Sequence, residues 1–275
     1  MIGAAGLAPA VLPEAGHTEG EHVQAQVKGS TMPVLEMVLD PGEQLVSDHG
    51  ELSWMTPNIQ MSQTTSAGQG GGGGLLGGLK RVMGGGSLFL TVYQAVGGQG
   101  MVSFAAKVPG HIFPLEVAPG QGYMVHRHGW VCGTNGVTPS MGFQQSLGGA
   151  LFGREGFILQ RLEGQGTAWV ELSGEVTTYD LGPGQSLLVH PGHVGAFQET
   201  VSFRVQRVQG IANRIFGADG FWLCALTGPG RIWLQSMPLP NLAAALGPYL
   251  GDQSQVVPAA EGGVVGGVLG NLLRG

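Results

Sequence analysis

Charged residues are scarce in this sequence, since Asp, Glu, Lys and Arg together make up only 11% of 275 residues. The 12 basic residues are outnumbered by 18 acidic ones, which gives a net charge of -6. A protein that binds nucleic acid broadly needs a basic surface for the phosphates. We therefore expect no nucleic-acid partner.

Cysteine is almost absent, and long apolar runs are missing. Cys132 and Cys224 lie in apolar runs without metal-binding or redox spacing, so we expect buried, reduced thiols. No Lys or Arg precedes Lys28, and no run reaches the roughly 20 apolar residues of a membrane span. The prediction is a cytoplasmic protein, with peripheral attachment to a membrane left open.

Glycine, by contrast, is abundant, with 52 residues in the chain. So much glycine disfavours long helices and favours short strands between Gly/Pro turns. The five tryptophans lie in strand-like runs, where we expect core or interface positions. The sequence thus predicts an all-β fold.

Two kinds of turn recur along the chain. Gly-x-Gly begins at Gly98, Gly164 and Gly228, and Pro-Gly begins at residues 41, 119 and 183. Such spacing predicts three pseudo-repeated units. Because the first and last units are incomplete in complementary ways, we expect N-terminal strands to pair with C-terminal ones and close a pseudo-threefold prism.

The first interval between Pro-Gly turns is the longest, which indicates an insertion in the first unit. We predict a flexible tail over residues 1–20, a three-repeat body over 21–237 with a Gly-rich insertion at 66–81, and a Pro/Gly-rich tail over 238–275. Two interpretations are open for residues 262–273 of this tail: a short amphipathic helix or a frayed end.

Apolar residues in the insertion and the tail are candidate contact residues. The insertion contains the Gly/Leu segment (Gly71 to Arg81), whose leucines would be exposed to water unless they dock on something. On a helix, the tail would carry an apolar stripe beside a glycine face. The predicted contact surface consists of Leu75, Leu76, Leu79, Lys80, Arg81, Val264, Val268 and Leu272. The alternative is that the leucines pack over the end of the prism.

Histidines supply the one set of residues with metal-ligand chemistry. Asp48, His126 and His190 each follow a turn proline by seven residues, and two imidazoles with a carboxylate form a known ligand set for iron-like divalent metals. His126 and His128 also match the start of a cupin motif and would share one strand face, although the expected glutamate is absent. His193 lies in the turn-like His190-Pro-Gly sequence. The alternative is that all are solvated or hydrogen-bonded turn histidines.

Six stretches of the sequence are specific enough to compare with a known family: Val34 to Glu43, Gly71 to Arg81 with Ser87 to Leu90, Phe157 to Leu162, Val189 to Phe197, Val205 to Val208, and Gly228 to Gln235. Together they resemble the mitochondrial biogenesis family called Altered Inheritance of Mitochondria, member twenty-four. The resemblance implies a fold like that of the tryptophan RNA-binding attenuation protein, a short double-stranded β-helix repeated three times. It implies no catalytic residues, and it links a fungal member to inner-membrane architecture.

The function that we expect is non-enzymatic binding or scaffolding without a cofactor, through a protein partner, self-association or contact with a membrane. The alternative is a cupin-like enzyme with a divalent metal held by the histidines. Ring-forming RNA binding rests on fold analogy alone and is disfavoured by the charge.

Overall fold

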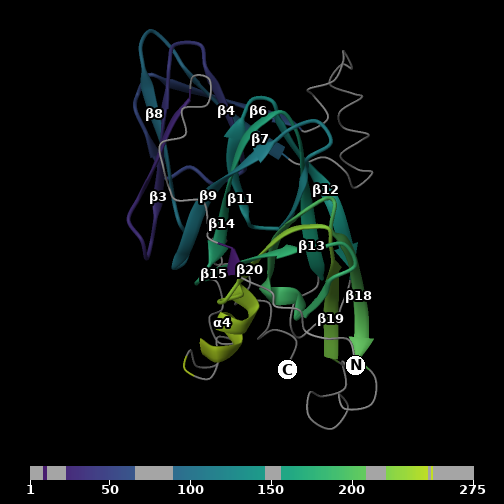
Figure 1. Cartoon of the computed structure of the whole chain (residues 1–275). Coiled ribbons are helices and arrows are strands. Elements are labelled where there is room, and N and C mark those ends of the chain that lie inside the picture. Colours follow the sequence, from purple (N-terminus) through teal and green to yellow (C-terminus); the bar gives the residue numbers. More distant parts are fainter. Residues whose placement is uncertain are drawn as a thin grey trace, which may run out of the picture. The chain divides into compact units, whose positions relative to one another are not determined.

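The computed structural model describes residues 9–10, 23–65, 89–145, 156–208, 221–246 and 249 (Figure 1). The chain divides into two compact units, Met1–Asn241 and Leu242–Gly275. Every described strand lies in the first unit, and all paired strands are antiparallel. The predicted all-β class is confirmed.

The strands alternate with short turns over most of the described chain. They are β1 (Pro9–Ala10), β2 (Gln24–Lys28), β3 (Val34–Leu39), β4 (Gln44–Asp48), β5 (Trp54–Met55), β6 (Ile59–Thr65), β7 (Phe89–Ala95), β8 (Gly100–Ala105), β9 (Gly110–Val117), β10 (Tyr123–His126), β11 (Trp130–Thr134), β12 (Val137–Gln145), β13 (Phe157–Gly164), β14 (Gly166–Ser173), β15 (Val176–Leu181), β16 (Ser186–Val189), β17 (Val194–Gln198), β18 (Ser202–Val208), β19 (Phe221–Thr227) and β20 (Gly230–Gln235).

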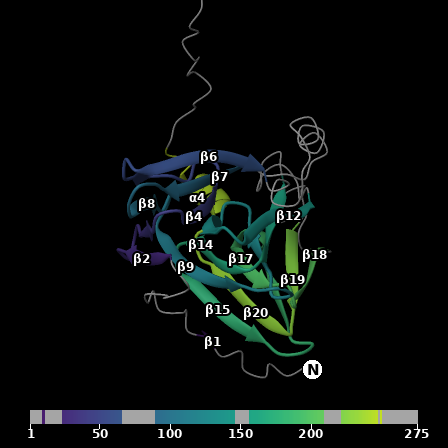
Figure 2. The ribbon, with the colours of Figure 1, turned by 90° about the horizontal axis from the view of Figure 1, so that it is seen from above.

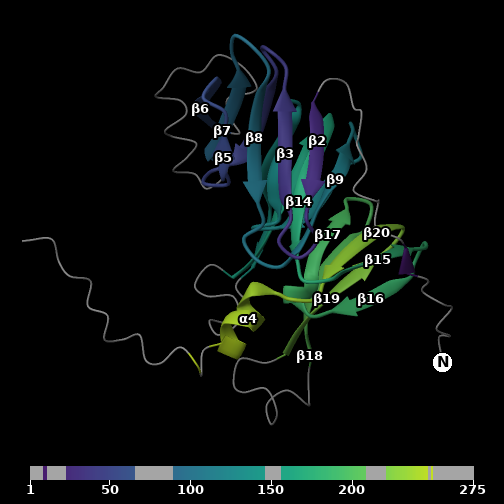
Figure 3. The ribbon, with the colours of Figure 1, turned by 90° about the vertical axis from the view of Figure 1, so that its left-hand side faces the viewer.

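These strands form four sheets. The orders are β2-β3-β8-β5, β6-β7-β4-β11-β14-β9, β1-β15-β20-β17-β10-β13-β12 and β16-β19-β18. Figure 2 shows β6 and β7 running side by side at one edge of the six-stranded sheet. Figure 3 shows β2, β3 and β8 side by side in the four-stranded sheet.

Three hydrophobic cores fill the spaces between the sheets. The first joins Leu35 and Phe104 of the four-stranded sheet to Trp169 of the six-stranded one. The second joins the opposite face of the six-stranded sheet to the seven-stranded one, and the third joins that sheet to the three-stranded one. Neighbouring residues of one strand therefore enter different cores, as Trp169 and Val170 do, because successive side chains point to opposite faces.

The recurring turns lie at corresponding places between strands. Pro-Gly connects β3 to β4, β9 to β10 and β15 to β16, and the glycines Gly42, Gly120 and Gly184 have φ of 90°, 76° and 75°. Only glycine adopts this left-handed backbone conformation without strain. Gly-x-Gly connects β7 to β8, β13 to β14 and β19 to β20. The residues singled out as turns are turns.

Strand pairing also follows a regular order. Pairs β3·β8, β9·β14 and β15·β20 each join strands five positions apart in the chain, while β4·β11 and β10·β17 join strands seven apart. The predicted closure is not seen, because β19 and β20 pair with none of β2 to β8 among the described strands. Among the described strands, β1 pairs with β15, the farthest along the chain that a strand of the N-terminal region reaches.

Most apolar residues lie where their patterns predict. Cys132 and Cys224 are buried and unpaired, and Trp130, Trp169 and Trp233 are at most 3% exposed. Burial raises the pKa of both thiols, that of Cys224 to about 12, so neither is a ready nucleophile. Trp54 differs, being 45% exposed on β5, so it is no core residue of one chain.

A helix at the start of the C-terminal segment was not predicted. Helix α4 (Leu239–Leu246) has the sequence LPNLAAAL. Pro240 suits the first turn, where its fixed φ favours the helix and a backbone N–H is not required, and the alanines that follow are strong helix formers. The described part of the chain contains no helix long and apolar enough to cross a membrane.

Candidate functional site

One face of the β6–β7 hairpin carries two exposed apolar residues, Met61 and Phe89, beside the buried Thr91 and Tyr93. Register pairs Met61 with Tyr93 and Gln63 with Thr91, and Phe89 lies two residues before Thr91, so these five side chains share one face of the two strands. Met61 is 48% exposed and Phe89 is 56% exposed. We call the set Met61, Gln63, Phe89, Thr91 and Tyr93 the hairpin face.

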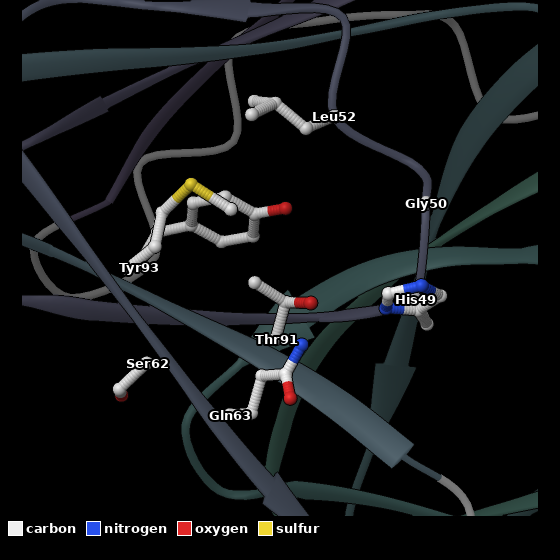
Figure 4. A pocket seen from close by; sticks show the side chains of 8 residues that line it. His49, Gly50, Leu52, Ser62, Gln63, Thr91 and Tyr93 are labelled. Carbon is white, nitrogen blue, oxygen red and sulfur yellow. The ribbon is translucent and has the colours of Figure 1, made fainter.

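The hairpin face borders a pocket of about 350 Å³. The lining residues from β6 and β7 are Met61, Ser62, Gln63, Thr91 and Tyr93, and those from the loop after β4 are His49, Gly50 and Leu52. Figure 4 shows the Tyr93 and Thr91 hydroxyls and the Gln63 amide between the hairpin and this loop.

The pocket is lined mainly by neutral polar and apolar groups. The Tyr93 hydroxyl lies 3.3 Å from Ser47 Oγ, and burial raises the pKa of the phenol, so it stays protonated near neutral pH. None of the described lining residues is a carboxylate, lysine, arginine or cysteine. These groups can hold a small polar group by hydrogen bonds, and His49 adds an imidazole to the described lining.

A cluster of ionisable residues lies beside the loop that carries His49. Lys107, after β8, forms an ion pair with Glu51, whose side chain is only 10% exposed. Glu171 of β14 accepts the Lys107 backbone N–H at 3.0 Å. Burial raises the pKa of both the Glu51 and Glu171 carboxyls, against the opposing effect of Lys107.

His126 lies at the edge of the same cluster. It ends β10, and its Nε2 is 3.3 Å from the backbone oxygen of Glu171. Burial lowers the pKa of its imidazole to about 4, so the ring is neutral at pH 7. Lys107 and His128 act in the same direction.

His128 does not share a strand face with His126. Strand β10 ends at His126, and His128 lies in the following turn, where it is exposed. The expectation that the two histidines share a strand face, which came from the cupin-like spacing, is therefore wrong. The strand ends at His126, six residues after Gly120 of the Pro-Gly turn, and the chain turns there.

His190 and His193 lie together at another place in the body. Pro191–His193 forms a 3-10 turn, as the sequence indicates, and the two imidazole centroids are 5.9 Å apart. His193 Nδ1 is 2.8 Å from the backbone oxygen of Gln235. The pKa of His190 is lowered, by burial first and by His193 second.

Asp48, His126 and His190 do occupy corresponding strand ends. Asp48 ends β4, His126 ends β10 and His190 directly follows β16. In the part of the chain that the structure describes, however, no three His, Cys, Asp or Glu side chains form a group that could hold a metal ion.

The predicted contact residues fall outside the described residues. Leu75, Leu76, Leu79, Lys80 and Arg81 belong to residues 66–88, which connect β6 to β7, and Val264, Val268 and Leu272 belong to the C-terminal segment. What the structure describes is the hairpin face from which the Gly/Leu segment departs.

Sequence reasoning missed the cluster around Lys107. One signal was present, because Glu171 is the only charged residue in the strand sequence GTAWVELS, and a carboxylate in an apolar strand needs a partner. The partners themselves come from loops distant in the chain, so no local pattern identifies them.

Comparisons with known proteins place the fold and the family. No curated protein matches the chain. The crystal structure of protein SPYM3_0169 from Streptococcus pyogenes is similar, with a TM-score of 0.66 and 23% sequence identity, over 83% of this chain and 100% of that one. At this identity the likeness concerns the fold. Residues 25–237 match the family described as Mitochondrial biogenesis AIM24, and the chain therefore belongs to the AIM24 family.

Proposed function

We propose that this protein is a non-enzymatic binding scaffold that docks peripherally on a membrane surface through the β6–β7 hairpin. The observation that carries the proposal is the exposed apolar surface of the hairpin face, with Phe89 56% and Met61 48% exposed. Phe89 pairs with Thr65, the last described pair before residues 66–88. The Gly/Leu segment belongs to the stretch that joins these two strands along the chain.

The composition of the Gly/Leu segment supports the same conclusion. Leu75, Leu76 and Leu79 supply apolar groups, and Lys80 and Arg81 supply positive charge in an otherwise acidic chain. Peripheral attachment combines apolar insertion with attraction to anionic lipids. A lysine or arginine side chain near an anionic membrane surface contributes about 1 kcal/mol to the free energy of binding.

A scaffold also requires a regular frame, and we infer that the body consists of three equivalent units. The recurring turns and the regular strand pairings support this inference. A recurring contact adds to it, because Glu171 accepts the backbone N–H of Lys107 and Gln235 accepts that of Ser173.

Vesicle co-sedimentation tests the docking proposal. We expect the purified full chain to sediment with vesicles that contain anionic phospholipid, and to do so less with purely zwitterionic ones. Met61→Ser combined with Phe89→Ser removes apolar groups of about 1 kcal/mol each or more, so binding should weaken at least tenfold. Lys80→Glu combined with Arg81→Glu should remove the preference for anionic vesicles.

Met141→Ser is the matched control, because Met141 is 39% exposed on β12, far along the chain from the hairpin. Its binding should equal that of the wild type. A wild-type chain that stays in the supernatant, or a hairpin variant that binds as well as the control, would refute the proposal.

A further inference from the structure

Two strand pairs connect neighbouring parts of the body in the same register. In β4·β11, Ser47 lies opposite Cys132 and Val46 opposite Gly133. In β10·β17, Val125 lies opposite Ala196 and Met124 opposite Phe197. In each pair, the first strand directly follows a Pro-Gly turn.

Three strands directly follow a Pro-Gly turn: β4, β10 and β16. The partners of the first two are β11 and β17, and the strand that corresponds to these partners for β16 is β5. Strands β5, β11 and β17 each pair with a strand that follows a Gly-x-Gly turn: Trp54 lies opposite Ser103, Cys132 opposite Trp169 and Ala196 opposite Trp233. Trp54, Cys132 and Ala196 are therefore corresponding residues, as are Ser47, Val125 and Val189.

This correspondence fixes the register that a β16·β5 pair would have. Val189 would lie opposite Trp54, and Leu188 opposite Met55, continuing the order of the two pairs that exist. Among the described strands, however, β16 pairs only with β19 and β5 only with β8. In Figure 3, β16 lies beside β19, and β5 lies in the four-stranded sheet, well apart from β16 in this view. The two strands cannot pair within this one molecule.

Both unpaired edges expose apolar side chains. Leu188 is 54% exposed and Trp54 is 45% exposed. The corresponding residues in the existing pairs are buried, since Val46 corresponds to Leu188 and Cys132 to Trp54, and both are 0% exposed. An open sheet edge with exposed apolar residues is a template for pairing with another chain.

We propose that β16 of one molecule pairs antiparallel with β5 of a second copy of this chain. A second copy is the occupant that the observations favour, because each molecule carries both complementary edges in the register already used twice inside the body. The contact is head-to-tail, so a pair of copies keeps one free β5 edge on one copy and one free β16 edge on the other. Such an interface closes into a ring or extends as a chain. The inference is independent of the membrane-docking proposal.

Sedimentation velocity over a concentration series tests the assembly. The wild-type chain is expected to associate beyond a dimer as its concentration rises. Trp54→Lys blocks one edge and Leu188→Lys blocks the other, since charge on an edge strand opposes pairing. Each variant alone should remain monomeric at concentrations at least tenfold above those at which the wild type associates.

Mixing the two variants gives the sharpest outcome. The Trp54→Lys protein retains an intact β16 and the Leu188→Lys protein retains an intact β5, so an equimolar mixture should form dimers and nothing larger. Met141→Lys, on the edge strand β12, is the control and should associate as the wild type does. Circular dichroism should show the same β-sheet content for all variants.

Cross-linking tests the register directly. Met55→Cys in one protein and Leu188→Cys in another should form an intermolecular disulfide on mild oxidation of the mixture, while Met141→Cys with Leu188→Cys should not. A wild-type chain that stays monomeric throughout the series, or a mixture that forms no dimer, would overturn the proposal. Phe89→Ser with Met61→Ser should leave assembly unchanged, so the two proposals can fail separately.

Discussion

Glu171 Oε1 accepts the backbone N–H of Lys107 at 3.0 Å, and Gln235 Oε1 accepts that of Ser173 at 3.1 Å. Both acceptors are almost fully buried, at 5% and 6% exposure. A carboxylate and a neutral amide thus perform the same task, each five residues after the first residue of its strand, β14 or β20.

Glu171→Gln should therefore keep the hydrogen bond and remove a buried charge. Burial raises the pKa of the Glu171 carboxyl, so its contribution to stability is fully present below the unfolded pKa and decreases as pH rises through the folded pKa. We expect Glu171→Gln to be as stable as the wild type at pH 5 and about 1 kcal/mol more stable at pH 8. Urea denaturation at both pH values measures this difference.

The control is Glu171→Leu, which leaves the Lys107 N–H without its acceptor. It should cost about 1 to 3 kcal/mol at either pH. Equal losses in the glutamine and leucine variants would contradict the idea that hydrogen bonding, and not charge, is what position 171 supplies.

His126 should make the protein sensitive to mild acid. Because burial lowers its pKa to about 4, the unfolded chain binds a proton between pH 6.5 and 4 that the folded chain does not. Stability is complete above pH 6.5 and falls through this window. The loss should be about 2 kcal/mol, below the full value of the shift because solvent reaches part of the ring.

Comparison of wild type with His126→Gln isolates this effect, since Glu51 and Glu171 contribute equally to both proteins. The difference in free energy of unfolding should change steadily from pH 7 to pH 4. His49→Gln, which removes an exposed histidine, should show no such change. Parallel pH curves for wild type and His126→Gln would mean that the imidazole is not protected from protonation.

Lys107→Met should destabilise the body, because it removes the partner of the nearly buried Glu51 carboxylate. We expect a loss of about 2 to 3 kcal/mol at pH 8. Burial raises the pKa of Glu51, so the carboxyl becomes neutral as pH falls and the loss should shrink towards pH 5.

Lys28→Met is the matched control, as Lys28 pairs with Glu36 where the side chains are 50% and 22% exposed. Exposed pairs contribute about 0 to 1 kcal/mol. If guanidinium denaturation gave the two lysine variants the same loss, the burial of Glu51 would have no energetic role.

Gly110→Ala tests the close contact of β9 and β14. A Cβ at Gly110 would lie 2.1 Å from the backbone oxygen of Leu172, so the strands would have to separate. We expect a loss of about 2 kcal/mol or more in the free energy of unfolding. Gly98→Ala, with nothing within 4 Å of its new Cβ, should change stability by about 0.5 kcal/mol or less.

The turns and cores could be predicted from the sequence because both depend on local patterns. A Pro-Gly pair fixes a turn wherever it occurs, and Trp169 or Cys132 needs only apolar neighbours in its own strand to indicate burial. The local pattern does not decide where the outcome depends on distant partners. Core and interface were both expected for the tryptophans, and Trp54 is exposed on β5, whose outer edge no described strand covers; no pattern around position 54 distinguishes it from Trp169.

The sequence did not predict the ionisable cluster around Lys107, because its members are distant from one another along the chain. Glu51 and Lys107 lie in different loops, separated by four strands, and their sequences resemble ordinary surface turns. The spacing of the histidines offered a shared metal site as an alternative to solvated or hydrogen-bonded turn residues, yet His126 ends a strand of one sheet and His190 follows a strand of another. Equal positions along corresponding strands do not imply closeness in space.

Burial of both faces of β14 has a consequence for strand alignment. Where a strand has one face in water, sliding it by one residue exchanges apolar and polar faces, and this costs free energy. Both faces of β14 are buried, so that cost is small, and the fixed lengths of the Gly-x-Gly and Pro-Gly turns must keep the strand aligned. Insertions should accordingly be tolerated between β6 and β7, where the turn spacing in the sequence indicates one, and should misalign the inner strands if placed at Gly164 to Gly166.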